Sequence, residues 1–135
     1  GLGDVYKRQV WNRFLLSPLE TRRFLDEIGS DYVGMYLDVG NAVYIGYPEQ
    51  WIEILGHRIK KLHMSDYRFD QAGIGAFVDL FAGDVDFPAV AKAIAGIGYD
   101  DYITLEMLPN YKQFPEVSLY ADKYAMNKII EMIHL

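Results

Sequence analysis

The sequence has no cysteine, which excludes disulfide bonds and metal sites built on thiolates and fits a reducing, cytoplasmic location. It contains no run approaching the roughly 18 apolar residues that a membrane span needs, and no secretory signal is visible. Acidic residues outnumber basic ones, 19 to 13, and the basic residues are scattered. Nucleic-acid sites usually cluster lysine and arginine, so a nucleic-acid partner is disfavoured, and nothing favours a membrane partner.

Hydrophobic residues make up 51% of the 135 positions, which excludes a disordered chain and suffices for one domain with a sizeable core. Residues 1–9 differ from the rest, because they show neither a helical nor a strand period. The string Gly-Asp-Val-Tyr-Lys-Arg-Gln at 3–9 resembles the translated adapter tails found on some assembled sequences. We expect residues 1–9 to be a non-native or disordered tail, with an ordinary frayed terminus as the alternative, and residues 10–135 to form one domain.

The apolar run at 33–38 does not alternate, which is typical of a strand buried on both faces of a parallel sheet. Two further strands are predicted at 59–64 and 102–107. Helices are predicted at 17–28, 48–55, 86–97 and 115–135, with a longer loop at 67–84. Repeated strand–helix units predict an α/β fold with a parallel sheet and right-handed crossovers.

The helix boundaries rest on capping residues. Ser17 is the expected N-cap of the first helix, with Pro18 in its first turn and Glu20 completing a capping box, and Gly29 ends it. For the last helix, the spacing predicts one shared apolar face. Its members are Val117, Tyr120, Tyr124, Ile130 and Ile133.

Each of the three predicted strands has a residue able to bind a metal ion at or near its C-terminal end, namely Asp38, His63 and Glu106. In a parallel barrel the C-terminal ends of the strands converge on one face, so these side chains can meet. One imidazole and two carboxylates suit Mn²⁺, Mg²⁺ or Co²⁺, with Zn²⁺ as a further candidate. Taken singly, Asp38 could cap a turn, His63 could be a core histidine and Glu106 could pair with a lysine.

Five stretches carry a resemblance to the xylose-isomerase-like TIM barrels, in particular to their sugar phosphate isomerase/epimerase branch, which includes ketose 3-epimerases and L-ribulose-5-phosphate 3-epimerase-like enzymes. They are Val-Trp-Asn-Arg-Phe-Leu-Leu-Ser-Pro at 10–18, Tyr-Leu-Asp-Val-Gly-Asn at 36–41, Lys-Leu-His-Met-Ser-Asp at 61–66, Gly-Asp-Val-Asp-Phe-Pro at 83–88 and Thr-Leu-Glu at 104–106. The resemblance covers essentially everything from Val10 onward. It is specific for the superfamily and says little about the substrate.

This resemblance implies a (β/α)₈ barrel and a divalent metal, Mn²⁺ first among the candidates, held by Glu, Asp, His and Glu from four successive strands. Asp38, His63 and Glu106 match the last three ligands, and Glu106 also matches one of two acid/base carboxylates. Asn41 and Arg68 fall near positions that contact substrate in relatives. Asp66 is grouped with them as a substrate-binding candidate that could instead orient His63 or the following loop.

The chain departs from the family pattern at its start. The first ligand, a Glu, is expected just before Val10, where this chain has Arg8 and Gln9. A complete barrel of this kind needs about 250 residues, so the chain is expected to supply about three βα units from the C-terminal part of one. Glu106 alone cannot invert a carbon centre by a two-base route. We therefore expect negligible epimerase activity and weak metal affinity from this chain alone.

For the complete protein, the resemblance implies proton abstraction next to a ketose carbonyl, giving an enediolate that a divalent cation stabilises. The substrate would be a sugar or sugar phosphate. One alternative is an endonuclease acting at abasic DNA, which shares the barrel but uses more histidine ligands around a zinc cluster. Another is a non-enzymatic half-barrel that self-associates as a homo-oligomer, because an open sheet has bare edges.

Overall fold

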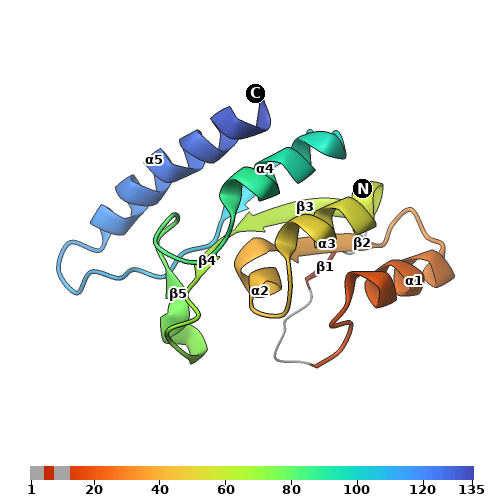
Figure 1. The fold of residues 1–135 in the computed structure, drawn as a ribbon, viewed down its shortest axis with the longest axis horizontal. Coiled ribbons are helices and arrows are strands. Elements are labelled where there is room, and N and C mark those ends of the chain that lie inside the picture. The colour runs from red at the N-terminus through yellow and green to blue at the C-terminus, as the bar shows by residue number, and fades with distance from the viewer. Residues whose placement is uncertain (1–4, 8–12) are drawn as a thin grey trace.

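The structure is a computed structural model that describes Val5–Lys7 and residues 13–135. Four parallel strands form its main sheet, in the order β1 (Val5–Lys7), β2 (Gly34–Asp38), β3 (Ile59–Met64) and β6 (Ile103–Leu105). Figure 1 shows β2 and β3 side by side in this sheet. Two short strands, β4 (Asp66–Tyr67) and β5 (Phe77–Val78), form a separate antiparallel pair.

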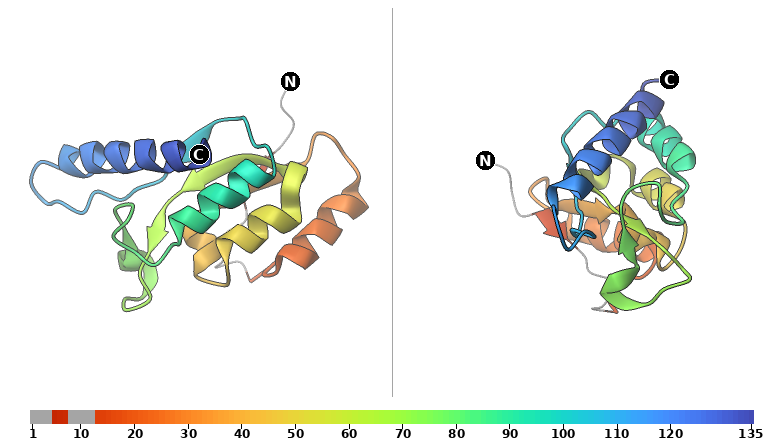
Figure 2. Two further views of the ribbon diagram at one scale, coloured as in Figure 1. Left: turned by 45° about the horizontal axis from the view of Figure 1, so that its top comes forward. Right: turned by 90° about the vertical axis from the view of Figure 1, so that its left-hand side faces the viewer.

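The helices are α1 (Pro18–Ile28), α2 (Val39–Val43), α3 (Pro48–Leu55), α4 (Phe87–Gly96) and α5 (Glu116–Ile133), with 3-10 turns at Gly56–Arg58 and Gly73–Ala76. Helices α1, α3 and α4 lie side by side along one face of the sheet, and α5 packs on α4 (Figure 2). This confirms the predicted α/β class with parallel strands. Successive parallel strands joined through helices on one face are the building units of a (β/α)₈ barrel.

The core lies between the sheet and the helices. Leu37 of β2 and Leu62 of β3 are fully buried together with Trp51 and Ile52 of α3 and Ile94 of α4. Side chains alternate across a strand, so the neighbours of Leu37 and Leu62 in sequence face the other side of the sheet. Tyr36, Asp38 and His63 therefore share the face that the helices leave open.

The start of α1 follows the prediction in part. The Ser17 hydroxyl accepts a hydrogen bond from the Leu19 N–H at 3.2 Å, and Gly29 ends the helix in the left-handed conformation with φ of 60°. Glu20 does not close a capping box on Ser17, because its carboxylate accepts from the Leu16 N–H at 3.1 Å instead. Glu20 therefore fixes the chain one residue before the cap.

The predicted apolar face of the last helix is wrong. Four of its five members are exposed, namely Val117, Tyr120, Tyr124 and Ile130. The residues of α5 that are buried are Ser118, Asp122, Ala125, Met126 and Ile129. Two polar contacts accompany this rotation of the helix. The Asp122 carboxylate accepts from the Leu80 N–H at 2.7 Å, and the Ser118 hydroxyl accepts from the Asn110 N–H at 3.2 Å. These bonds and the packing on α4 hold this other face of α5 inward.

Two other expectations concern the beginning of the chain. Residues 1–9 were expected to lie outside the fold, yet Val5–Lys7 form a parallel edge strand against Gly34–Tyr36 of β2, so a disordered tail does not describe these three residues. Whether the segment is native stays a prediction. The departures from the family pattern at Arg8 and Gln9 fall at positions outside the described residues. Among the described helices, none is long and apolar enough to cross a membrane.

Candidate metal centre

Three neighbouring strands bring Asp38, His63 and Glu106 together. Asp38 ends β2 and pairs in register with His63 of β3, while Glu106 follows β6 directly and its N–H donates to the Met64 carbonyl at 2.9 Å. The three side chains therefore stand in a row across the C-terminal ends of the strands. The convergence predicted from the sequence is present among the described residues.

The potential ligand atoms of Asp38, His63 and Glu106 all lie within 4.8 Å of one another. The Nδ1 atom of His63 is 2.5 Å from Glu106 Oε2 and 3.6 Å from Asp38 Oδ2, so this nitrogen faces both carboxylates. The side chain of Asp38 is 1% exposed, that of His63 13% and that of Glu106 46%. The cluster is closed on the Asp38 side and open on the Glu106 side, which leaves room for a ligand.

The buried Asp38 carboxylate is held by its surroundings. Its Oδ1 accepts from the Ser65 hydroxyl at 2.6 Å and from the Asn41 N–H at 3.0 Å, and the Gly40 N–H donates to the Ser65 hydroxyl at 3.2 Å. Burial acts to raise the pKa of Asp38, but hydrogen bonds with His63, Glu106, Ser65 and Asn41 outweigh it and hold the pKa well below its usual range. Asp38 also caps α2, so the capping role and the site role coincide.

Gly40 is required by this close approach. A Cβ atom at Gly40 would overlap the Ser65 hydroxyl and lie 3.1 Å from the Ser65 carbonyl carbon. The end of β2 can therefore come this near to the end of β3 only with glycine at position 40. The Asp-Val-Gly-Asn sequence thus supplies both the Asp38 carboxylate and the glycine that allows Ser65 to approach it.

The other side of the His63 ring is also held. The Tyr36 hydroxyl is hydrogen-bonded to His63 Nε2, and the two rings meet edge to face with centroids 4.2 Å apart. Tyr36 precedes Asp38 by two residues on β2, so both side chains lie on the same face of the sheet. His63 is thereby oriented between a phenol and two carboxylates.

This donor set fits a divalent cation. One imidazole nitrogen and two carboxylate groups converge on one point, and such oxygen-rich sets suit Mg²⁺, Mn²⁺ or Co²⁺ while also accepting Zn²⁺. Burial of Asp38 with its hydrogen bonds in place keeps it ionised, which is the form that binds a cation. Among the described residues, the other two histidines lie elsewhere, His57 in the turn before β3 and His134 at the end of α5.

Asn41 lines a pocket beside the cluster. The pocket has a volume of about 180 Å³ and is walled by Ile74, Phe77, Val78, Met107 and Leu108 together with Asn41 and Glu106. The Asn41 side chain is almost fully buried, and its Oδ1 atom has no hydrogen-bond partner in the described part of the chain. Asn41 therefore brings an amide group into the wall of the pocket that Glu106 also lines.

The structure separates the two remaining substrate-binding candidates from this pocket. Asp66 is fully buried, and its carboxylate accepts from the N–H groups of Tyr67, Gly83 and Val85 at 2.9, 2.8 and 3.2 Å. Asp66 therefore orients the loop, the second of its proposed roles, and its substrate-binding role stays a prediction. Arg68 makes a two-bonded ion pair with Asp70 at 2.9 and 2.5 Å on the surface, and its substrate-binding role stays a prediction.

Sequence reasoning missed Tyr36 and Ser65. Both could have been found from their spacing, because each lies two residues from a predicted ligand, Tyr36 before Asp38 and Ser65 after His63. Residues two apart on a strand share a face, so polar groups at these positions are expected to reach the ligands. The sequence analysis proposed that Asp66 could orient His63, whereas Ser65 supports the cluster by donating a hydrogen bond to Asp38.

The chain combines parallel βα units with a cluster of three potential metal ligands at the C-terminal ends of the strands, which defines a portion of a parallel α/β barrel with a candidate metal centre. Residues 7–126 match the family described as xylose isomerase-like TIM barrel, and the chain belongs to this family. A comparison with curated protein sequences gave no significant match.

Solved structures show the same fold. A crystal structure of the IolI protein with a bound zinc atom is 19% identical with a TM-score of 0.71, covering 84% of this chain and 43% of its own. A xylose isomerase domain protein from Planctomyces limnophilus is 17% identical with a TM-score of 0.72, covering 87% and 45%. An L-ribulose 3-epimerase is 17% identical with a TM-score of 0.63, covering 87% and 42%. The chain therefore spans less than half the length of these structures.

Proposed function

We propose that the protein of which this chain forms part is a divalent-metal-dependent isomerase or epimerase of a sugar or sugar phosphate. The observation that carries the proposal is the convergence of Asp38, His63 and Glu106 at the ends of three parallel strands. Support comes from structures similar in fold. One of them is an L-ribulose 3-epimerase, and another is a protein with a bound zinc atom.

The residues of the cluster are proposed to have different roles, which follow from how exposed their side chains are. When bound, a divalent cation supplies a Lewis acid that stabilises an enediolate. Asp38 and His63, both largely shielded, would hold it. Glu106, whose side chain is about half exposed and lines the pocket, would accept a proton from a substrate carbon. The Asn41 amide would contact a substrate hydroxyl. Inversion at that carbon needs a second carboxylate on the opposite face, which these described residues do not supply.

The first prediction concerns metal binding. The chain should bind Mn²⁺ or Co²⁺ saturably in a calorimetric titration, and Asp38→Ala should weaken binding by at least about 100-fold because it removes the most buried ligand. Asp31→Ala, which removes an exposed acid from the loop before β2, is the matched control and should bind as the wild type does. Equal affinities for the wild type and Asp38→Ala would contradict the assignment of Asp38.

The second prediction concerns proton transfer. In D₂O with Mg²⁺, the chain should exchange the carbon-bound proton next to the carbonyl of D-fructose or D-ribulose 5-phosphate slowly, without accumulating the epimer. Glu106→Gln keeps the shape of the side chain and should abolish the exchange. The exchange would be followed by NMR as the loss of that proton's signal, recorded after the metal has been removed from each sample. Exchange at the wild-type rate in Glu106→Gln would show that another group moves the proton.

A further inference from the structure

We infer that Tyr36 is a positioning residue of the metal centre, one whose hydroxyl fixes the His63 ring so that Nδ1 is the metal-binding nitrogen. The inference rests on the proposed function, because it concerns the same cluster. It adds a residue to which neither the sequence motifs nor the family resemblance gives a role.

The geometry shows a ring held from two sides. His63 Nδ1 points to Glu106 and Asp38, at 2.5 and 3.6 Å, and Nε2 on the opposite side of the ring is hydrogen-bonded to the Tyr36 hydroxyl. Flipping the ring would remove both sets of contacts together. The edge-to-face packing of the two rings, with 4.2 Å between centroids, limits the ring further.

Imidazole chemistry links this contact to metal binding. A neutral imidazole carries one N–H, so a nitrogen that gives its lone pair to a cation leaves the proton on the other nitrogen. With Nδ1 as ligand, Nε2–H must donate, and the Tyr36 hydroxyl oxygen is the acceptor at that position. Metal-binding histidines generally donate their second N–H to such a partner, and loss of that partner typically costs 10- to 100-fold in metal affinity.

The backbone keeps Tyr36 in this place. Tyr36 and Asp38 project from the same face of β2, and Asp38 is paired in register with His63 on β3. The phenol therefore comes from the same strand as a ligand, two residues away, and no loop intervenes. A contact built on two paired strands is more precise than one built on loops.

Calorimetry with Zn²⁺ and ¹⁵N NMR of the histidine rings test the inference on the wild-type chain, Tyr36→Phe and Tyr99→Phe. Tyr36→Phe keeps the ring contact and removes only the hydroxyl. Tyr99→Phe removes a hydroxyl that donates to the Tyr102 carbonyl at 2.8 Å, a bond made outside the cluster, and is the matched control. The chain has only three histidines, so His57→Gln and His134→Gln assign the His63 signals.

We expect Tyr36→Phe to bind Zn²⁺ 10- to 100-fold more weakly than the wild type and to speed exchange of the His63 Nε2 proton with water in the loaded protein. Tyr99→Phe should change neither. Unchanged affinity and unchanged proton exchange in Tyr36→Phe, with the wild type binding Zn²⁺, would overturn this inference alone. If the wild type binds no Zn²⁺, both the inference and the metal centre of the proposed function fail.

Discussion

Asp66→Ala is expected to lower the free energy of unfolding by about 3–5 kcal/mol, because it strips three backbone N–H groups of their acceptor in one step. These groups belong to Tyr67, Gly83 and Val85, and the carboxylate that serves them is fully buried. Each unsatisfied buried donor costs about 1–3 kcal/mol. Chemical denaturation followed by circular dichroism would measure the loss.

The matched control is Asp86→Ala. Asp86 is exposed and caps α4 through a single bond from the Ala89 N–H at 3.0 Å, so its removal should cost about 1 kcal/mol. Equal losses in Asp66→Ala and Asp86→Ala would show that the buried network contributes no more than an ordinary cap. The chain also packs closely against this network at Gly83, where a Cβ atom would overlap the Asp66 carboxylate.

The cost of Asp66→Ala should also depend on pH. Burial raises the pKa of Asp66, and the hydrogen bonds from Gly83, Val85 and Tyr67 only partly offset this. A carboxyl group whose pKa is higher in the folded state stabilises the fold more at low pH, and this contribution is lost as pH rises from about 4 through the folded pKa. The destabilisation by Asp66→Ala should therefore be larger in mild acid than at neutral pH.

The hydrogen bonds of Asp66 affect the candidate site because the loop that they hold carries residues of the pocket wall. Ile74, Phe77 and Val78, which wall the pocket beside Glu106, lie between Asp66 and the amides of Gly83 and Val85 that it holds. The two ends of this loop are tied to one carboxylate. The pocket wall is thus placed by a residue that does not touch the pocket.

The triad could be predicted from the sequence because it depends only on where strands end. Asp38, His63 and Glu106 each lie at or near the end of a strand that could be predicted, and the geometry of parallel strands brings those ends together. Asn41 was predicted as a substrate contact from the resemblance, and the structure places it in the pocket wall with Glu106. Strand ends and their spacing are local properties of the chain, so a single sequence carries them.

The features that could not be predicted depend on contacts between distant segments. Which of two helical stripes of α5 turns inward is decided by the bond from Leu80 to Asp122, and the amino acid spacing of α5 allows either stripe. The pairing of β4 with β5 could not be predicted from the sequence, because each strand has only two residues. Ser65 and Asp66 are adjacent, and only the fold shows that the first supports Asp38 and the second the loop.

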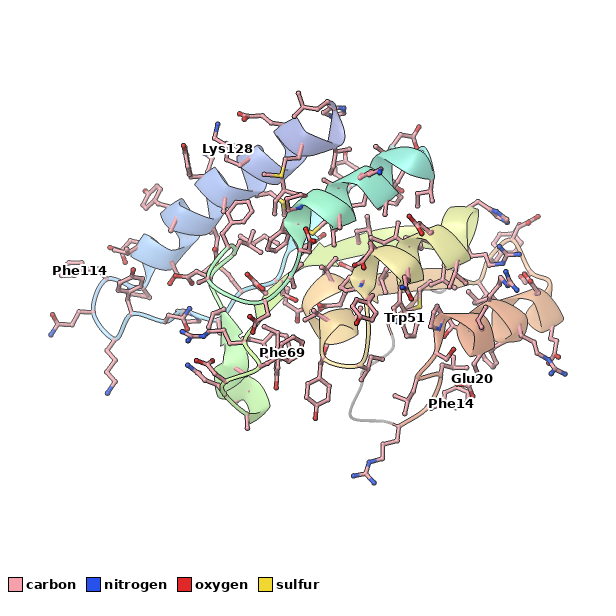
Figure 3. All side chains as sticks on the ribbon, viewed as in Figure 1. Phe14, Glu20, Trp51, Phe69, Phe114 and Lys128 are labelled. Carbon is pink, nitrogen blue, oxygen red and sulfur yellow. The ribbon has the colours of Figure 1, made fainter. Side chains whose placement is uncertain are left out.

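Trp51→Ala is expected to lower the free energy of unfolding by about 3–5 kcal/mol, a large part of the roughly 5–15 kcal/mol that a domain has. Trp51 lies on α3, which contacts α1, α2 and α4, and it is one of the largest fully buried side chains (Figure 3). Its removal leaves a cavity in the middle of the helix layer that supports β2 and β3. Thermal or denaturant unfolding would measure the effect. Tyr102→Ala, at a site 86% exposed, should change stability by less than about 0.5 kcal/mol, and a similarly small change in Trp51→Ala would contradict the placement of the core.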